Sequence, residues 1–303
     1  MTSLRFAKMH GTGNDYILID GMKEPVAGPE TLARVMSDRH FGVGADGLIL
    51  ALPPEREVEA HMRMRMFNAD GSEAEMCGNG IRCLCKYVID RRLAEAQPLR
   101  VQTAAGVLSL DYELDSAGRV EQVTVDMGEP ILDVERIPVD VPELAWEGVP
   151  GHWAIGVDDE CWIGVFVSMG NPHVVLFDEE HPELMPPDPD ELDVRYWGPR
   201  IERHRAFPRR INVHWVKVMS RSEIRMRTWE RGSGETLACG TGAAAVCAAG
   251  FVTGRTERLL RAHLPGGELR LRWDEATNHL FMTGPAAEVF EGVWTGPGNA
   301  QRR

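Results

Sequence analysis

The chain has 303 residues, of which 43% are hydrophobic and 26% charged, with 31 glycines and 19 prolines. This composition is typical of a globular protein of about two domains, and it excludes disordered, low-complexity and fibrous chains. Asp and Glu outnumber Lys and Arg, which gives a formal net charge of −13. A basic surface for nucleic acid or for anionic lipid is therefore not expected.

The length of the apolar runs and the spacing of the cysteines indicate the cellular compartment of the protein. The longest apolar run, residues 243–252, is much shorter than the roughly 20 residues of a membrane-spanning helix. The start of the chain lacks the apolar run of a secretory signal. We therefore expect a cytoplasmic protein without membrane contact. Its six cysteines should be reduced thiols, and no spacing of the metal-ligand type predicts a metal site.

Hydrophobic periodicity predicts a chain dominated by β-sheet. Alternating apolar and polar residues predict strands at 61–67, 211–216 and 223–229, with shorter strands at 101–103, 107–112 and 120–126. Apolar residues at helical spacing predict helices at 31–40, 81–92 and 243–252. The fold class is therefore expected to be α/β, of the α+β kind, with few helices.

An internal repeat divides the chain into two related halves. Residues 73–80 and 235–242 share the pattern Glu-x-x-x-Cys-Gly-x-Gly, and each copy lies between a predicted strand and a predicted helix. A weaker echo pairs Gly13-Asn14 with Gly170-Asn171. The sequence therefore predicts two similar domains, each with one copy of the cysteine motif.

A turn-forming stretch after Met127 marks the expected boundary between these halves. The N-terminal domain is expected to span residues 1–128 and the C-terminal domain residues 129–279. A last strand within residues 280–303 is expected to return to the first domain. The acidic, Pro-rich segment 178–190 is expected to be a surface insertion.

Cys77 and Cys239, the cysteines of the repeat, stand at the predicted starts of helices. The positive end of a helix dipole lowers the pKa of a thiol, and free N–H groups at a helix start can bind a carboxylate. Two such helix starts could hold one carboxylate with a thiol on each face of the adjacent carbon. One thiol would then remove the α-proton while the other supplies one. This arrangement predicts a two-base racemase or epimerase.

Burial is the usual fate of a free cysteine, and it is the alternative for each cysteine taken alone. Two copies of the motif, each with Gly-x-Gly and an upstream Glu, favour a function for Cys77 and Cys239. No such context surrounds the other four cysteines, to which we assign no role: Cys83, Cys85, Cys161 and Cys247. A non-catalytic thiol redox switch or thiolate metal site is the alternative from another functional class.

Four segments of the chain resemble diaminopimelate epimerase, an enzyme of lysine and peptidoglycan precursor synthesis that uses no cofactor. They follow one another over nearly the whole chain and are residues 9–16, 68–82, 170–173 and 229–242. The resemblance implies two pseudo-symmetric domains, each a curved, barrel-like, mostly antiparallel sheet around a central helix, with the active site in the cleft between the domains. It also suggests a homodimer that acts on a small molecule, without nucleic acid, membrane or cofactor.

The resemblance assigns the acid and base chemistry to Cys77 and Cys239. They would interconvert LL- and meso-diaminopimelate, and their roles would exchange in the reverse direction. One should be thiolate and the other thiol at rest, because two neighbouring thiolates repel each other. His173 and Glu230 are implied as hydrogen-bonding neighbours that tune Cys77 and Cys239 respectively. A structural turn and a surface acid are the alternatives for these two residues.

Further residues are implied as substrate contacts by their motif positions. Their side chains and backbone groups suit a zwitterionic amino acid, and they are Asn14, Asn68, Gly78, Asn79, Asn171, Asn212, Glu230, Arg231, Gly240 and Thr241. Arg231 is expected to bind the distal carboxylate of diaminopimelate through two hydrogen bonds. A turn residue is the alternative for a lone Asn, above all for Asn14, and an ordinary surface side chain is the alternative for Arg231.

Two patterns distinguish this chain from other enzyme classes. Residues 42–47 match GxGxxG, but they follow a predicted helix and precede a strand, which reverses the order of a dinucleotide-binding fingerprint. Gly47 stands where some members of the resembled family carry a substrate-binding Gln, and it cannot supply that contact.

Proline and histidine racemases of the same fold are the enzymatic alternative. Proline racemases usually carry His where Asn79 stands, and their substrate has no second carboxylate for Arg231.

Overall fold

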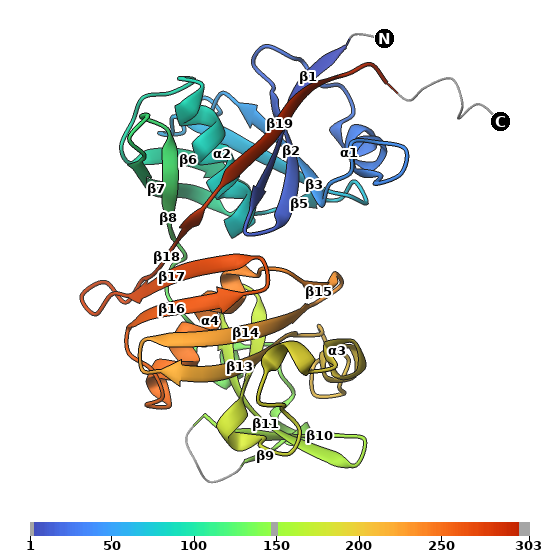
Figure 1. The fold of residues 1–303 in the computed structure, drawn as a ribbon, viewed down its shortest axis with the longest axis vertical. Coiled ribbons are helices and arrows are strands. Elements are labelled where there is room, and N and C mark those ends of the chain that lie inside the picture. Colours follow the sequence, from blue (N-terminus) through green and yellow to red (C-terminus); the bar gives the residue numbers. More distant parts are fainter. Residues whose placement is uncertain (1–2, 147–150, 297–303) are drawn as a thin grey trace, which may run out of the picture. The chain divides into compact units, whose positions relative to one another are not determined.

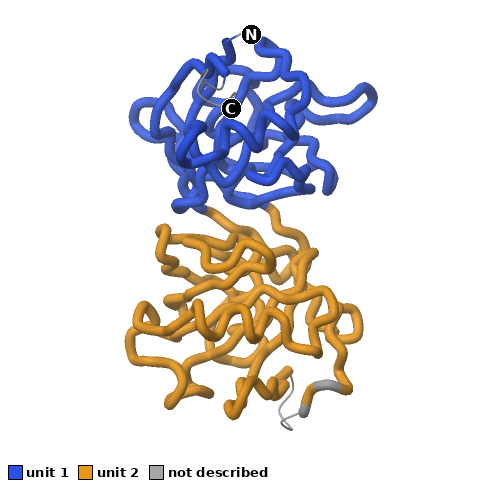
Figure 2. The backbone as a smooth tube through the Cα atoms, turned by 90° about the vertical axis from the view of Figure 1, so that its right-hand side faces the viewer, with its two compact units in different colours: residues 1–125, 284–303 blue, residues 126–283 orange. Residues whose placement is uncertain are grey.

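The computed structural model of the chain describes residues 3–146 and 151–296 (Figure 1). The chain divides into two compact units, which Figure 2 shows in different colours. Unit 1 spans residues 1–125 and 284–303, and unit 2 spans residues 126–283.

Strands dominate the described residues, which also contain four α-helices. The helices are α1 (Pro29–Ser37), α2 (Gly78–Asp90), α3 (Val194–Glu202) and α4 (Gly240–Val252). Unit 1 carries β1 (Leu4–Gly11), β2 (Asn14–Asp20), β3 (Gly47–Leu52), β4 (Met62–Asn68), β5 (Glu73–Ala74), β6 (Leu99–Thr103), β7 (Gly106–Leu114), most of β8 (Val120–Asp126) and β19 (Ala287–Trp294). Unit 2 carries β9 (Ala145–Trp146), β10 (Trp153–Val157), β11 (Glu160–Ser168), β12 (Pro172–Phe177), β13 (Asn212–Ser220), β14 (Glu223–Glu230), β15 (Gly234–Thr236), β16 (Leu259–Leu264), β17 (Gly267–Trp273) and most of β18 (Leu280–Pro285).

The two units repeat one order of strand pairing. In unit 1, β2 and β3 pair in parallel, β3 pairs antiparallel with β4, and β4 then pairs antiparallel with β5 and in parallel with β6. In unit 2, β12, β13, β14, β15 and β16 pair with the same sequence of directions. The preceding hairpin, β1–β2 or β11–β12, is antiparallel in both units. This correspondence confirms the predicted fold class of two related, mostly antiparallel units, and β19 adds an antiparallel partner for β1.

Helices α2 and α4 occupy corresponding places in the repeat, between β5 and β6 and between β15 and β16. Helix α2 contacts β1, β2, β3, β4 and β19, whereas α4 contacts β11, β12, β13, β16 and β17. Helix α4 is rich in Ala and is buried on every side, as expected of a helix that is apolar all round. Each of these helices is thus the buried helix of its own sheet.

Three predicted helices are present with shifted boundaries, and α3 is an element that the pattern did not predict. Pro199 and Gly198 lie in the middle of α3, where both residues disfavour a helix. The helix forms because Asp193 caps its start by accepting a hydrogen bond from the backbone N–H of Tyr196. Packing also requires Gly198, because a Cβ there would lie 2.3 Å from the ring of Trp229.

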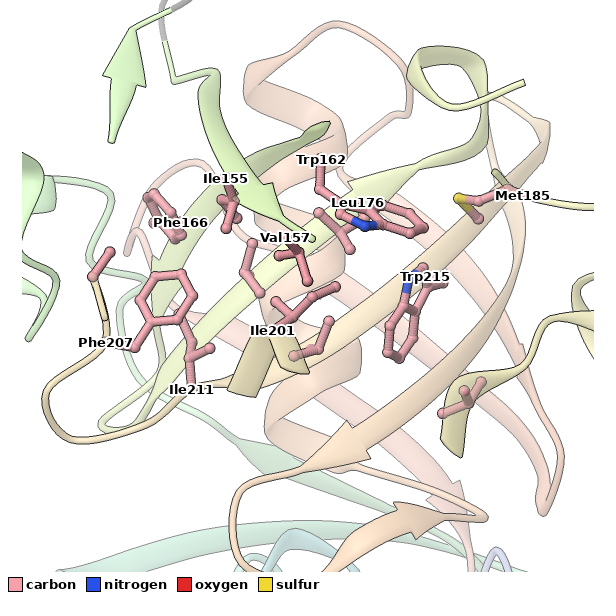
Figure 3. Packing of buried hydrophobic residues seen from close by; sticks show 14 of the residues in the cluster. Ile155, Val157, Trp162, Phe166, Leu176, Met185, Ile201, Phe207, Ile211 and Trp215 are labelled. Atoms are coloured by element: carbon pink, nitrogen blue, oxygen red, sulfur yellow. The ribbon is translucent and has the colours of Figure 1, made fainter. Parts of the chain in front are cut away.

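One hydrophobic cluster of unit 2 combines strand residues with residues of α3 and the segments beside it in sequence. Figure 3 shows Trp162 and Trp215 in this core, and their rings pack edge to face with centroids 6.5 Å apart. Met185 belongs to the same cluster although it lies in segment 178–190. The expectation of a surface insertion is therefore wrong in part, because this segment contributes a buried side chain to the core.

The loop and strand order around residues 42–47 follows the sequence prediction. These residues connect α1 to β3, so a helix precedes them and a strand follows.

Among the described residues, no helix combines the length and the apolar character that crossing a membrane would need.

Candidate active site

Cys77 and Cys239 occupy equivalent backbone positions in the two units. Each is the N-cap of its buried helix, with extended backbone angles of φ −142° and ψ 124° for Cys77 and φ −121° and ψ 109° for Cys239. Each carbonyl accepts the first helical hydrogen bond, from Ile81 and Ala243 respectively, at 2.9 Å. The next N–H groups belong to the helix start, where helical geometry provides no carbonyl partner. Gly78, Asn79, Gly240 and Thr241, all predicted site residues, carry four of these groups.

The structure brings three predicted residues of unit 1 together and adds one that sequence reasoning missed. Asn14 Oδ1 lies 3.7 Å from Cys77 Sγ and accepts a hydrogen bond from Asn79 Nδ2 at 3.2 Å. The unforeseen residue is Tyr16, whose hydroxyl lies 3.0 Å from Cys77 Sγ and 2.5 Å from Asn14 Oδ1. Tyr16 is buried, so this hydroxyl is held within the unit.

The orientation of the Asn14 amide is fixed from its other end. Asn14 Nδ2 donates to Asp46 Oδ2 at 2.6 Å, and a carboxylate can only accept. Arg39 in turn donates to Asp46 and to Asp15, at 2.7 and 2.8 Å. Asn14 Oδ1 must therefore face Tyr16 and Cys77.

A buried cation, Arg82, lies near the start of α2. The Arg82 side chain is fully buried, and it donates to the Gly78 carbonyl at 3.1 Å and to Thr12 Oγ1 at 3.2 Å. Its charge interacts with Cys77, and a positive charge favours the thiolate over the thiol. Sequence reasoning missed Arg82 because an Arg in an amphipathic helix is ordinarily exposed.

Unit 2 surrounds Cys239 with different groups. Thr241 Oγ1 lies 3.6 Å from Cys239 Sγ, and Asn171 Nδ2 lies 3.4 Å from the same hydroxyl. The Glu230 carboxylate also hydrogen-bonds the Cys239 thiol, and it accepts a hydrogen bond from Thr236 Oγ1 at 2.6 Å. The structure thus brings Asn171, Glu230 and Thr241 to Cys239.

Burial and the Glu230 charge raise the pKa of Cys239 well above the usual value for a thiol. Hydrogen bonds from the Thr241 hydroxyl and the Gly242 N–H lower the same pKa, but by less. The expectation that a helix start lowers the pKa of this cysteine is therefore wrong for Cys239. The side chain is almost completely buried, and the loss of solvation of the thiolate outweighs the helix start.

His173 belongs to a buried chain of hydrogen bonds in unit 2. Its Nε2 lies 2.8 Å from Asn171 Oδ1, and its Nδ1 lies 2.9 Å from Nε2 of His214. His214 Nδ1 lies 3.0 Å from Thr228 Oγ1. His214 was not predicted. Its ring packs closely against the start of α4, where a Cβ on Gly242 would lie 2.2 Å from it. Cys77, the expected partner of His173, lies in the other unit.

The remaining predicted residues form local contacts. Asn68 Nδ2 donates to Ser72 Oγ at 2.9 Å. Asn212 is buried, and its amide donates to the Pro172 carbonyl at 3.0 Å and accepts from the Arg231 N–H at 2.9 Å. Arg231 is exposed, and its guanidinium donates to the Arg209 carbonyl at 3.1 Å. Asn212 therefore positions the backbone that carries Arg231.

A signal for Tyr16 was present in the repeat. The echo that pairs Asn14 with Asn171 also pairs Tyr16 with His173, two residues further along each chain segment. The pairing register agrees, because Tyr16 faces Gly47 across β2–β3 and His173 faces Asn212 across β12–β13. Extending the repeat by two residues would have identified Tyr16 as a candidate.

Comparison with known proteins identifies the family to which the chain is similar. The family model for diaminopimelate epimerase matches residues 6–132 and 165–289. A diaminopimelate epimerase from Moorella thermoacetica is 50% identical over 291 residues, which cover 95% of this chain and 98% of that protein. One from Acetivibrio thermocellus is 47% identical over 289 residues, with 95% and 98% covered.

Solved structures share the fold at low sequence identity. A phenazine biosynthesis protein of the PhzF family from Bacillus anthracis superposes with a TM-score of 0.67 at 16% identity, covering 97% of this chain and 99% of that one. A probable proline racemase from Agrobacterium radiobacter K84 gives 0.69 at 16% identity, covering 98% and 94%. These similarities concern the fold alone.

Proposed function

The chain belongs to the diaminopimelate epimerase family of isomerases, and from this premise we propose that it interconverts LL- and meso-2,6-diaminopimelate with two cysteines, Cys77 and Cys239. The observation that carries the proposal is the position of each cysteine as the N-cap of its unit's buried helix. Such a pair of thiols suits proton transfer at a carbon beside a carboxylate.

In the proposed reaction, the thiolate of one cysteine removes the α-proton and the thiol of the other delivers a proton to the opposite face of the same carbon. The carbanion that forms needs stabilisation by groups already in place, because no cofactor accepts its electrons. N–H groups at the starts of α2 and α4 are the natural partners of the substrate's α-carboxylate. Reversal of the reaction exchanges the roles of the two cysteines.

The remaining residues would select the substrate. Asn14, Asn68, Asn79, Asn171 and Asn212 offer amides that can donate or accept without adding charge beside a thiolate. Arg231 is proposed to hold the distal carboxylate, since a guanidinium binds a carboxylate through two parallel hydrogen bonds. Glu230 is proposed to tune Cys239. The hydrogen bond between Glu230 and Cys239 supports this role. A direct hydrogen bond from His173 to Cys77 is not proposed, because both ring nitrogens of His173 already have partners in unit 2.

The proposal also places the enzyme in lysine and peptidoglycan precursor synthesis, in the cytoplasm, as a homodimer. The family supports the pathway. Sedimentation equilibrium would test the oligomeric state, and a monomer at all protein concentrations would contradict the dimer.

The decisive experiment follows the α-carbon of the substrate. Reduced protein is incubated with LL-diaminopimelate in D2O without added cofactor, and deuterium incorporation and stereochemistry are measured. We expect wash-in with inversion for the wild type and its loss in Cys77→Ala and in Cys239→Ala. Cys161→Ala is the control, because Cys161 is exposed and lies outside the site. It should retain full exchange.

Two outcomes would contradict the proposal. Exchange with proline or histidine but not with diaminopimelate would preserve the two-thiol chemistry and refute the substrate. Absence of exchange with every amino acid tested would refute the catalytic proposal itself.

A further inference from the structure

We propose that Tyr16 is a catalytic residue of this site, whose hydroxyl hydrogen points to Asn14 Oδ1 when Cys77 is a thiol and turns to Cys77 Sγ when Cys77 is a thiolate. This inference rests on the proposed role of Cys77 and adds a residue to it. Its basis is the hydroxyl of Tyr16, which lies within hydrogen-bond distance of both atoms, 2.5 Å from Oδ1 and 3.0 Å from Sγ.

The number of hydrogens determines the two states. A phenol has one hydrogen to donate and lone pairs with which to accept. Asn14 Oδ1 can only accept, and Asp46 fixes the amide so that this oxygen faces Tyr16. When Cys77 carries its proton, the S–H can donate to the phenol oxygen at 3.0 Å or to Asn14 Oδ1 at 3.7 Å, and in both cases the phenol donates to Oδ1. When Cys77 is a thiolate, sulfur becomes an acceptor and takes the phenol hydrogen.

Rotation of the hydroxyl leaves Asn14 Oδ1 with a donor. Asn79 Nδ2 donates to the same oxygen at 3.2 Å in either state. The thiolate therefore gains a hydrogen bond while no buried acceptor loses its last partner. Hydrogen bonds to charged groups are about twice as strong as those between neutral groups, so this exchange favours the thiolate.

Tyr16 keeps its own proton throughout the cycle. Burial and the neighbouring Cys77 raise the pKa of the phenol well above its usual value. The proton that leaves the substrate's α-carbon is therefore taken up by Cys77 sulfur, whose lone pair forms the S–H bond. Tyr16 only reorients and undergoes no net proton transfer.

Arg82 strengthens the same preference in unit 1. Its buried guanidinium interacts with Cys77 from within α2, five residues further along the chain. In unit 2 the corresponding residue is Ala244, and the carboxylate of Glu230 is the group that hydrogen-bonds Cys239. Unit 1 thus stabilises a thiolate at Cys77, whereas Glu230 disfavours one at Cys239.

The test measures the titration of Cys77 directly. Wild type and Tyr16→Phe are alkylated with iodoacetamide over a range of pH, and the modified tryptic peptide of residues 66–82, which contains no other cysteine, is quantified by mass spectrometry. We expect Tyr16→Phe to raise the midpoint for Cys77 by about one pH unit or more, which lowers its thiolate fraction about tenfold at neutral pH. The kcat for deuterium wash-in should fall in parallel.

Tyr87→Phe is the matched control. Tyr87 is a buried tyrosine of the same unit whose ring packs against the Arg91 guanidinium, and it should leave the Cys77 midpoint unchanged. A midpoint in Tyr16→Phe equal to that of the wild type, in a variant with an unchanged thermal melt, overturns the inference. If the wild type shows normal exchange in that case, the proposed function stands. If the wild type shows no exchange, the proposed function fails and the catalytic role of Tyr16 fails with it.

A second measurement needs no substitution at position 16. Wild-type protein labelled with 13C at the tyrosine Cζ is titrated by NMR, and Cys77→Ala assigns the response. We expect one tyrosine signal to shift with the Cys77 midpoint and to lose that shift in Cys77→Ala. No tyrosine signal that follows Cys77 would overturn the inference, even if Tyr16→Phe did not fold.

Discussion

Nδ1 of His173 lies 2.9 Å from Nε2 of His214, and both imidazoles are completely buried in unit 2. The neighbouring groups give this contact a direction. Asn171 Oδ1 can only accept, so His173 must carry its hydrogen on Nε2. His173 Nδ1 then accepts from His214 Nε2–H, and His214 Nδ1 accepts from the hydroxyl of Thr228. All these hydrogen bonds point from Thr228 towards Asn171.

This direction predicts the tautomer of both histidines. We expect His173 and His214 to be neutral near pH 7, with the hydrogen on Nε2 in each ring, because burial lowers the pKa of both. Long-range 1H–15N NMR correlations distinguish the two tautomers and the cation. His279 is an internal reference, because its hydrogen bond to Asp126 raises its pKa and it should titrate. A hydrogen on Nδ1 of either buried ring would contradict the prediction.

Thr228→Val should destabilise unit 2 by about 1–3 kcal/mol, because His214 Nδ1 loses its donor while it remains buried. Thr228→Ser keeps the hydroxyl and removes only a methyl group, so its loss should be clearly smaller. Urea unfolding of the two variants beside the wild type makes the comparison. Equal losses in the two variants would show that the methyl group matters and the hydroxyl does not.

The buried histidines predict a loss of stability in mild acid. Burial lowers the pKa of His214 from 6.5 to about 3. Between these values the unfolded chain binds a proton that the folded chain does not. The free energy of unfolding therefore falls as the pH falls below 6.5, by up to about 1.4 kcal/mol per pH unit for this one group. Urea unfolding at several pH values from about 7.5 to about 5 measures the slope.

A pair of variants isolates the contribution of His214. His214→Gln keeps a polar side chain that cannot titrate, and it should flatten the slope below pH 6.5. His279→Gln should act in the opposite sense, because the pKa of His279 is raised by Asp126 and its contribution is lost as the pH rises. If His214→Gln leaves the slope of the wild type unchanged, His214 is charged in the folded protein and the buried chain is incorrectly described.

Helices and strands whose formation depends on residues close together in the sequence could be predicted from the sequence. Strand β4 was predicted because its alternating Met and Arg residues match the two faces of a strand. Helix α4 was predicted from the apolar run 243–252, although it begins earlier, at Gly240, and includes the Gly-x-Gly that was expected to precede it. Helix α3 was not predicted, because Gly198 and Pro199 oppose a helix locally. The close packing of Gly198 involves Trp229, which lies on β14 and is distant in sequence.

The residues of the candidate site also divide into those with a local signal in the sequence and those without one. Both cysteines were found from a repeated motif, which is a local property of the sequence. Tyr16 and His214 were not found, because their importance comes from contacts across the fold with Cys77 and His173. The pKa of Cys239 was predicted in the wrong direction because the helix start is visible in the sequence, whereas the extent of burial is not.

Glu230→Gln should make Cys239 a stronger acid. The Glu230 charge is, after burial, the largest cause of the raised pKa of Cys239, and a neutral amide can still accept the hydrogen bond from the thiol. We therefore expect faster alkylation of Cys239 at neutral pH and a shift of the alkaline limb of the kcat profile to lower pH. Fragment-ion spectra separate Cys239 from Cys247, which lies in the same tryptic peptide.

Glu235→Gln is the matched control for this last experiment. Glu235 lies on β15 and pairs with Arg195 and Arg227, so its removal takes away a carboxylate near Cys239 in sequence that the thiol does not contact. We expect the alkylation rate of Cys239 to stay at the wild-type value in this variant. An equal acceleration in both variants would mean that net charge, and not the contact with Glu230, sets the acidity of Cys239. No acceleration in Glu230→Gln would leave burial as the sole cause and would refute the tuning role of Glu230.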